Sequence, residues 1–236
     1  MSPRHGRFIN NKEDGSYRIE GVSAGIATLE LTAPGYAAPL DSVPVRPGQT
    51  TKKTYHLESE GILRGVVRRN GEPSAHGYII FPDYAGHASG GTNKNGEYEV
   101  KGLAAGEHLV GYTMWLYEDQ RGGAQATYHQ RVHIESGQTT NVDIEYNGTG
   151  IIHGTFSGMS EHNWRVGLYK TPEASEKNRC AGTWKFQENG VYEIPGVPPG
   201  TYTIVATSTD DAGEVWEQSQ TLTLGDGAVE QVDFSF

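Results

Sequence analysis

Two histidines have the spacing that comes nearest to a metal-binding pair in this chain. They are His129 and His133, four positions apart in the strand predicted at residues 128–135. On a strand such a pair faces one side of the sheet, but the usual rise places the two residues about 13 Å apart. Both rings then cannot bind one metal directly, so we expect two exposed strand histidines, no metal site and no cofactor.

Other reactive side chains are present without a setting that would activate them. Residues 210–214 (Asp-Asp-Ala-Gly-Glu) carry three carboxylates and could hold a weak Ca²⁺, although a solvated hairpin tip is the simpler interpretation. Ser, His and Asp all occur, but no Gly-x-Ser-x-Gly elbow places a serine as a nucleophile. We therefore predict no catalytic residues and no enzyme.

Aromatic side chains offer a more promising binding surface. If alternate residues from 108 to 114 face the core, Trp115 and Tyr117 face outward on one side of the same strand. Two rings on a sheet face, with Trp184 as a third, could stack on a sugar or a peptide. The alternative is that this face packs against a neighbouring domain or against the loop of residues 118–126.

One phrase, repeated three times, organises the elements around these residues. Each copy opens with a turn dipeptide whose Gly suits a positive φ, alternates polar and apolar residues, and closes at a second Gly-punctuated corner. The pattern predicts a turn, a half-buried strand, a corner and another strand. The copies are DGSYRIEGVSAG (Asp14–Gly25), NGEYEVKGLAAG (Asn95–Gly106) and NGVYEIPGVPPG (Asn189–Gly200).

The interval between copies suits small β domains. Gly15 to Gly96 is 81 residues and Gly96 to Gly190 is 94, too long for a solenoid repeat. We predict three tandem domains, at residues 1–58, 59–147 and 148–236, with about seven short strands in the second and no helical periodicity. The links between them are short, which predicts a semi-rigid rod.

Composition limits the possible partners and compartments. A net charge of -10 with a pI near 5.3 argues against nucleic acid, and no apolar run approaches the roughly 20 residues that span a bilayer. The lone Cys180 excludes an intrachain disulfide and lies in what reads as a polar loop. The first residues, MSPRHGRF, have no signal-peptide pattern.

The middle of the chain resembles a known family of β-sandwich modules. NGEYEVKGLAAGEHLV, with GVVRRNGEPSAHGYIIF before it and VHIESGQTTNVDIEY after it, resembles a carboxypeptidase regulatory-like domain. This is the transthyretin-like (prealbumin-like) sandwich, which is related to Cna B-type repeats. The resemblance covers the second and third domains and the later part of the first. It implies Ig-like/transthyretin-like sandwiches that serve as spacer, adhesion or interaction modules in secreted, cell-surface or periplasmic proteins.

Active and cross-linked relatives of this architecture carry motifs that the chain lacks. Intradiol dioxygenases bind iron through two Tyr and a His-x-His pair, and hydroxyisourate hydrolases end in Tyr-Arg-Gly-Ser, whereas this chain ends Asp-Phe-Ser-Phe. Some Cna B-type domains form an isopeptide bond from a Lys in the first strand, but residues 62–67 and 151–156 contain no Lys. These resemblances therefore imply no activity.

The first domain is predicted to be incomplete at its N-terminus. Gly61 to Gly96 is 35 residues and Met1 to Gly15 is 14, so the first copy is shorter by 21. Missing strands would expose sheet edges and four apolar side chains, which is an aggregation hazard in a monomer. These acceptor residues are Tyr17, Ile19, Leu29 and Leu31.

Two functions remain open from the sequence. A strand from the next copy of the chain could fill the gap and join molecules into a filament, or the missing strands could lie upstream in a longer protein, or the domain could be a smaller variant. We predict a non-enzymatic extracellular structural or adhesion protein whose partners are proteins, including copies of itself. The alternative is a carbohydrate-binding accessory module of a secreted polysaccharide-degrading system, with Trp115, Tyr117 and Trp184 as its platform.

Overall fold

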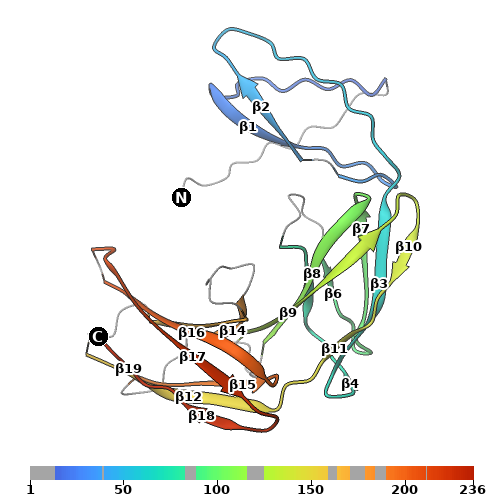
Figure 1. Ribbon diagram of the computed structural model, residues 1–236. Helices are drawn as coiled ribbons and strands as arrows, with labels where there is room; N and C mark the ends of the chain where they lie inside the picture. Colours follow the sequence, from blue (N-terminus) through green and yellow to red (C-terminus); the bar gives the residue numbers. More distant parts are fainter. Residues whose placement is uncertain are drawn as a thin grey trace.

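The fold is all-β, as predicted. The computed structural model describes residues 14–38, 40–82, 89–115, 125–158, 164–170, 179–183, 190–210 and 212–236, with the backbone alone at 115, 125–128 and 183. Strands, turns and irregular segments make up these ranges, without an α-helix (Figure 1). In the same ranges no helix is present that could cross a membrane.

The central sandwich consists of two sheets formed within residues 61–146. The first sheet is centred on β3, which pairs in parallel with β10 and β11 and antiparallel with β4 and β7. The second sheet is antiparallel, with the order β6-β5-β8-β9. The strands are β3 (Gly61–Arg69), β4 (Glu72–Pro73), β5 (Tyr78–Ile80), β6 (Gly90–Gly91), β7 (Glu97–Leu103), β8 (Gly106–Trp115), β9 (Gln125–Ile134), β10 (Thr139–Asn141) and β11 (Ile144–Tyr146).

The C-terminal sandwich repeats this plan. Here β12 takes the place of β3, with β15 antiparallel to it and β18 and β19 parallel. The second sheet has the order β14-β13-β16-β17. The strands are β12 (Gly150–Ser157), β13 (Arg165–Tyr169), β14 (Arg179–Thr183), β15 (Val191–Val197), β16 (Gly200–Thr209), β17 (Val215–Leu224), β18 (Val229–Gln231) and β19 (Phe234–Ser235).

Each sandwich has its own apolar core, built from the alternation in the repeated phrase. In β7, Tyr98 and Val100 are buried while Glu97 and Glu99 face solvent. In β8, Val110, Tyr112 and Met114 belong to the core, as the predicted register requires, although Gly111 and Thr113 between them are buried too. The two cores share no residue, since one lies within 63–146 and the other within 152–234. The predicted domain boundaries themselves stay predictions.

The opening turn of the phrase has the predicted backbone. Gly15, Gly96 and Gly190 have φ values of 78°, 75° and 75°. At Gly96 a Cβ would also overlap the carbonyl oxygen of Val67 in the neighbouring strand β3. Glycine is therefore required in the central sandwich by both conformation and space.

The first unit, residues 14–58, contains a single strand pair among its described residues. β1 (Gly25–Glu30) pairs antiparallel with β2 (Leu40–Val45), in the places that β8 and β9 occupy in the central sandwich. The half-buried strand that the first copy of the phrase predicts at residues 17–19 is not formed, so that prediction was wrong, and residues 54–57 are not a strand either. Their counterparts β7 and β11 both pair with β3, and the described part of residues 14–58 contains no equivalent of β3 to receive them.

The predicted location of Cys180 in a polar loop was also wrong. Cys180 lies in β14 rather than in a polar loop, and its side chain is buried in the C-terminal core. Its Sγ lies 3.1 Å from the carbonyl oxygen of Leu168, and burial raises the pKa of the thiol to about 11. The residue is thus part of the packing.

The units follow one another along an arc (Figure 1). β9 and β14, the facing edges of the two sandwiches, lie against each other. The first unit lies at the other end of the central sandwich, beyond β3 and β7 (Figure 1).

Candidate functional site

A buried tyrosine closes each sandwich at the same point. The Tyr98 hydroxyl donates to the carbonyl oxygen of Val142 at 2.6 Å, and the Tyr192 hydroxyl donates to that of Val232, also at 2.6 Å. Both carbonyls lie where the last strand is broken, between β10 and β11 or between β18 and β19. Burial raises the pKa of both phenols, so each remains a protonated donor. We call each tyrosine–carbonyl pair a tyrosine clasp.

A glycine passes directly beneath each clasp. Gly65 of β3 lies under the Tyr98 clasp, and an added Cβ would overlap the Val142 oxygen and lie 3.1 Å from Tyr98 Cε1. Gly154 of β12 lies under the other clasp, where a Cβ would overlap the Val232 oxygen. Since the blocking atoms are backbone, they cannot move aside without shifting the last strand. A strand can therefore pass beneath a clasp only if it has a glycine at that position.

An aspartate after the clasp carbonyl completes the pairing across the break. Asp143 Oδ1 accepts the backbone N–H of Val66 at 2.9 Å, and Asp233 Oδ1 accepts that of Thr155 at 2.8 Å. Hydrogen bonds from the Thr155 hydroxyl and N–H lower the pKa of Asp233. The carboxylate thus replaces a missing ladder acceptor for the strand beneath the clasp.

The first unit contains the same clasp. Its segment GQTTKKTYHLE aligns with GQTTNVDIEYN of the central sandwich, which puts Lys53 in the place of Val142 and Thr54 in that of Asp143. The Tyr17 hydroxyl donates to the carbonyl oxygen of Lys53 at 3.3 Å. In the described part of this unit no strand passes beneath the clasp.

The four predicted acceptor residues lie on this unfilled side. They are partly exposed, whereas their equivalents in the central sandwich are 0–5% exposed. By position in the phrase, Tyr17, Ile19, Leu29 and Leu31 correspond to Tyr98, Val100, Val110 and Tyr112. Within residues 14–38 and 40–58, Ala37 is the only buried apolar side chain. The unit thus presents one side of a core without the strand that covers it in the other units.

The junction between the two sandwiches is closely fitted. The Tyr146 hydroxyl donates to the carbonyl oxygen of Gly196 at 2.7 Å, and Tyr146 is 2% exposed. Gly148 donates its N–H to Asn70 Oδ1 at 2.9 Å, and its carbonyl oxygen accepts from Asn70 Nδ2 at 3.3 Å. A Cβ at Gly148 would overlap the Gly196 oxygen. The short link therefore fixes one sandwich against the next.

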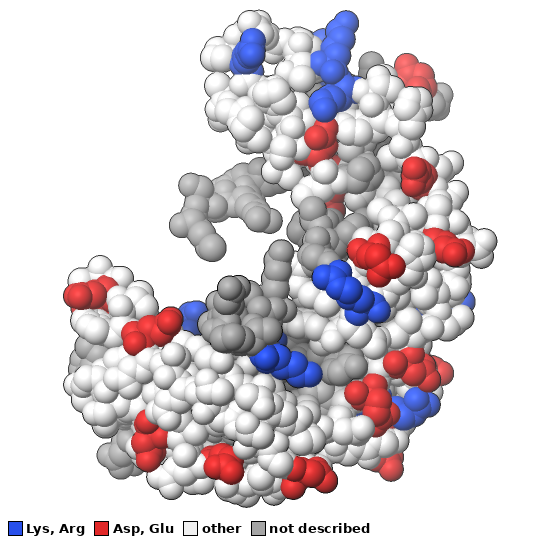
Figure 2. Space-filling model, viewed as in Figure 1, with Lys and Arg blue, Asp and Glu red and all other residues white. Residues whose placement is uncertain are grey.

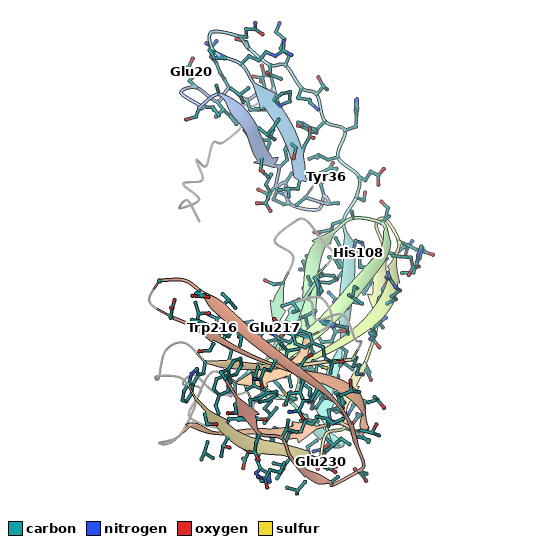
Figure 3. All side chains as sticks on the ribbon, turned by 60° about the vertical axis from the view of Figure 1, so that its left-hand side comes forward. Glu20, Tyr36, His108, Trp216, Glu217 and Glu230 are labelled. Carbon is teal, nitrogen blue, oxygen red and sulfur yellow. The ribbon has the colours of Figure 1, made fainter. Side chains whose placement is uncertain are left out.

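The junction of the first unit uses the same corner of the phrase. Ala38 donates its N–H to the carbonyl oxygen of Gly102 at 3.2 Å, and the N–H of Gly102 donates to Glu60 Oε2 at 2.7 Å. Tyr36 lies at this end of the first unit and Glu20 near its outer end (Figure 3). The residues that form the junction are therefore different from those that form the acceptor side.

The predicted aromatic platform lies outside the described residues. That holds for Tyr117, Trp184 and the side chain of Trp115, so their role in binding stays a prediction. His133 Nδ1 lies 2.7 Å from Glu107 Oε1 on the neighbouring strand. No group of three His, Cys, Asp or Glu side chains in the described ranges could hold a metal ion.

In the acidic run of residues 210–214, one carboxylate accepts a hydrogen bond that closes the local turn. Asp210 Oδ1 accepts the N–H of Glu214 at 2.8 Å, and the N–H of Gly213 donates to the Asp210 carbonyl oxygen. Asp211 lies outside the described residues.

Acidic and basic side chains are interspersed on the face shown in Figure 2.

Comparison with known proteins gives no family. No protein-family model matches the chain, and the search of curated proteins found no match. Among solved structures, the Bacillus anthracis TIE protein matches 96% of the chain at 16% identity with a TM-score of 0.29, and the chain spans 44% of its length. The minor pilin GBS52 of Streptococcus agalactiae (10% identity, 74% of this chain and 94% of that chain, TM-score 0.31) is also similar.

A third similar structure is BcpA, the major pilin subunit of Bacillus cereus, at 12% identity over 95% of this chain and 88% of that chain, with a TM-score of 0.26. TM-scores this low carry no argument about function. The strand order and register of the chain itself define its fold.

Proposed function

We propose that the chain is a non-enzymatic structural or adhesion protein of the extracellular space or cell surface. Its sandwiches act as a spacer, and its first unit accepts a β-strand from a neighbouring protein molecule. The observation that carries this proposal is the Tyr17–Lys53 clasp, which the first unit keeps although no described strand lies beneath it. When the neighbour is another copy of the chain, the contact repeated head to tail forms a filament.

The spacer role is supported by the junction between the sandwiches. The buried hydrogen bond of Tyr146 and the part-buried reciprocal hydrogen bonds of Asn70 and Gly148 hold the two bodies, in place of a flexible tether. The resemblance to modules of secreted and surface proteins supports the location. Spin labels on the two sandwiches are expected to give one narrow distance distribution, and a broad one would contradict the spacer role.

Strand acceptance is tested by two substitutions on the same strand. Leu29 of β1 is partly buried on the acceptor side, whereas Ile26 of the same strand is 72% exposed. Where the neighbour is another copy of the chain, Leu29→Asp should prevent concentration-dependent association in light scattering and electron microscopy, because it places a charge where an added strand must pack. Ile26→Asp is the matched control and should associate like the unaltered chain.

One result would remove filament formation from this proposal. It is a chain that stays monomeric at every concentration while amide hydrogens of residues 16–20 and 51–57 exchange as slowly as those of β7 and β11. The first unit would then be closed by itself, and the spacer role would remain alone.

A further inference from the structure

The two complete sandwiches specify the kind of strand that the first unit would take. Beneath each clasp the glycine is flanked, two positions away on either side, by apolar residues that are 0–1% exposed. They are Leu63 and Val67 around Gly65, and Ile152 and Phe156 around Gly154. Resting on the strand-acceptor role proposed above, we infer that the first unit binds a partner strand of the pattern apolar-x-Gly-x-apolar, selected by the Tyr17 clasp.

The direction of the strand follows from the same comparison. β3 and β12 run antiparallel to the strand of the repeated phrase and parallel to the broken last strand. In the first unit the corresponding segments are residues 16–20 and 51–57, which are not strands among the described residues. An inserted strand therefore runs antiparallel to the first segment and parallel to the second, and it converts both to strand.

Selection for glycine is steric and does not depend on sequence elsewhere in the strand. The Val142 and Val232 carbonyl oxygens are held over the glycine by the tyrosine hydroxyl, and any Cβ would overlap them. The Lys53 oxygen is held by Tyr17 in the same way, at the longer distance of 3.3 Å. A side chain at the central position must open the clasp before the strand can pair.

Thr54 makes the inserted strand easier to release than β3 or β12. At this position the sandwiches have Asp143 and Asp233, whose carboxylates accept an N–H of the strand beneath the clasp. A hydroxyl is a weaker acceptor than a carboxylate, because hydrogen bonds to charged groups are stronger. The site is thus suited to a strand that arrives from outside and exchanges.

The occupant is a segment of a separate partner polypeptide. Residues 1–13 contain one glycine, Gly6, and its neighbours two positions away are Arg4 and Phe8, so the charged side chain breaks the pattern. In a second copy, the two strands that pass beneath a clasp, β3 and β12, already lie in their own cores. A partner strand is therefore favoured over both of these sources.

Peptide binding to the full chain tests the inference. The probe is the fluorescently labelled peptide GILRGVVRR, which copies residues 61–69, and its control carries the change equivalent to Gly65→Val. We expect the glycine peptide to bind and to slow amide exchange in residues 16–20 and 51–57. The valine peptide should bind about tenfold more weakly or worse, because overpacking against the clasp is unfavourable.

Variants of the chain separate the possible outcomes. Thr54→Asp should strengthen binding of the glycine peptide, Leu29→Asp should abolish it, and Ile26→Asp should leave it unchanged. Equal binding of both peptides, with protection in the first unit, overturns glycine selection and leaves strand acceptance standing. Absence of binding by either peptide overturns strand acceptance too. Competition by a synthetic peptide of residues 1–13 with equal affinity overturns the choice of a separate partner as the occupant.

Discussion

The tyrosine clasp makes a quantitative prediction for Gly154→Ala in the C-terminal sandwich. The added Cβ would lie 2.7 Å from the Val232 carbonyl carbon, closer still to its oxygen, and 3.1 Å from Tyr192 Cε1. These neighbours belong to the broken last strand and to the tyrosine that holds it. The methyl group therefore cannot be accommodated unless the last strand moves away from β12.

The cost follows from the hydrogen bonds that this movement would break. They are Val232 N–H to the His153 oxygen at 2.9 Å, Thr155 N–H to Asp233 Oδ1 at 2.8 Å, and the Tyr192 hydroxyl to the Val232 oxygen at 2.6 Å. At about 1 kcal/mol each these bonds amount to about 3 kcal/mol, and overpacking adds about 1 to 2 kcal/mol more. We expect a loss of roughly 4–5 kcal/mol in the free energy of unfolding.

Urea unfolding monitored by tryptophan fluorescence measures this loss. Trp164 reports on the core of the C-terminal sandwich, because its ring stacks on that of Phe156 with centroids 4.8 Å apart. The matched control is Gly227→Ala, at a φ of 63° with no atom within 4 Å of the added Cβ, which should cost only about 1 kcal/mol. If both variants lose the same stability, the clasp does not hold the last strand tightly, and the inference of glycine selection loses its basis.

Three further predictions concern the turn, the junction and the cysteine. Gly96→Val should destabilise the central sandwich by about 2–4 kcal/mol in a thermal melt, through the positive φ and the crowded Val67 carbonyl; an unchanged melt would contradict the turn assignment. Tyr146→Phe should speed proteinase K cleavage at the junction by removing the bond to Gly196, with both cores still folded; an unchanged cleavage rate would contradict that bond's role. Cys180 should resist thiol reagents in the folded protein. Because its pKa is raised from 9.0 to about 11, it should contribute stability that is complete below pH 9 and lost as pH rises towards 11, a loss that Cys180→Ala removes from the pH profile of urea unfolding.

Local signals were sufficient for those elements whose pairing partner lies within the same unit. The repeated phrase predicted the turn glycines and the buried faces of β7 and β8, because alternation and turn chemistry are properties of the segment itself. The same phrase did not form a strand at residues 16–20. Strand formation there requires a β3-type neighbour, and no periodicity within the phrase reports whether that neighbour is present.

The tyrosine clasp and the burial of Cys180 were both missed from the sequence, although the clasp left a signal there. A tyrosine occupies the same place in all three phrases, and Gly65 and Gly154 occupy the same place in the first strands, which together mark the clasp. The burial of Cys180 had no such mark. Its strand, RCAGT, shows no alternation, and its position depends on β13, whose Leu168 faces Ala181.

The need for an added strand can be argued from how little the first unit buries. A two-stranded hairpin is marginal in water, and a segment of this size stabilises itself only with a substantial core. Residues 14–58 have one buried apolar side chain in their described part, Ala37, and its N–H donates to the Glu58 oxygen beside the junction. The unit is thus anchored to its neighbour at one end while its clasp side stays partly exposed. An inserted strand with apolar residues on both sides of a glycine would cover Ile19 and Leu29 as β3 covers Val100 and Val110, and that burial is the free energy that would drive binding.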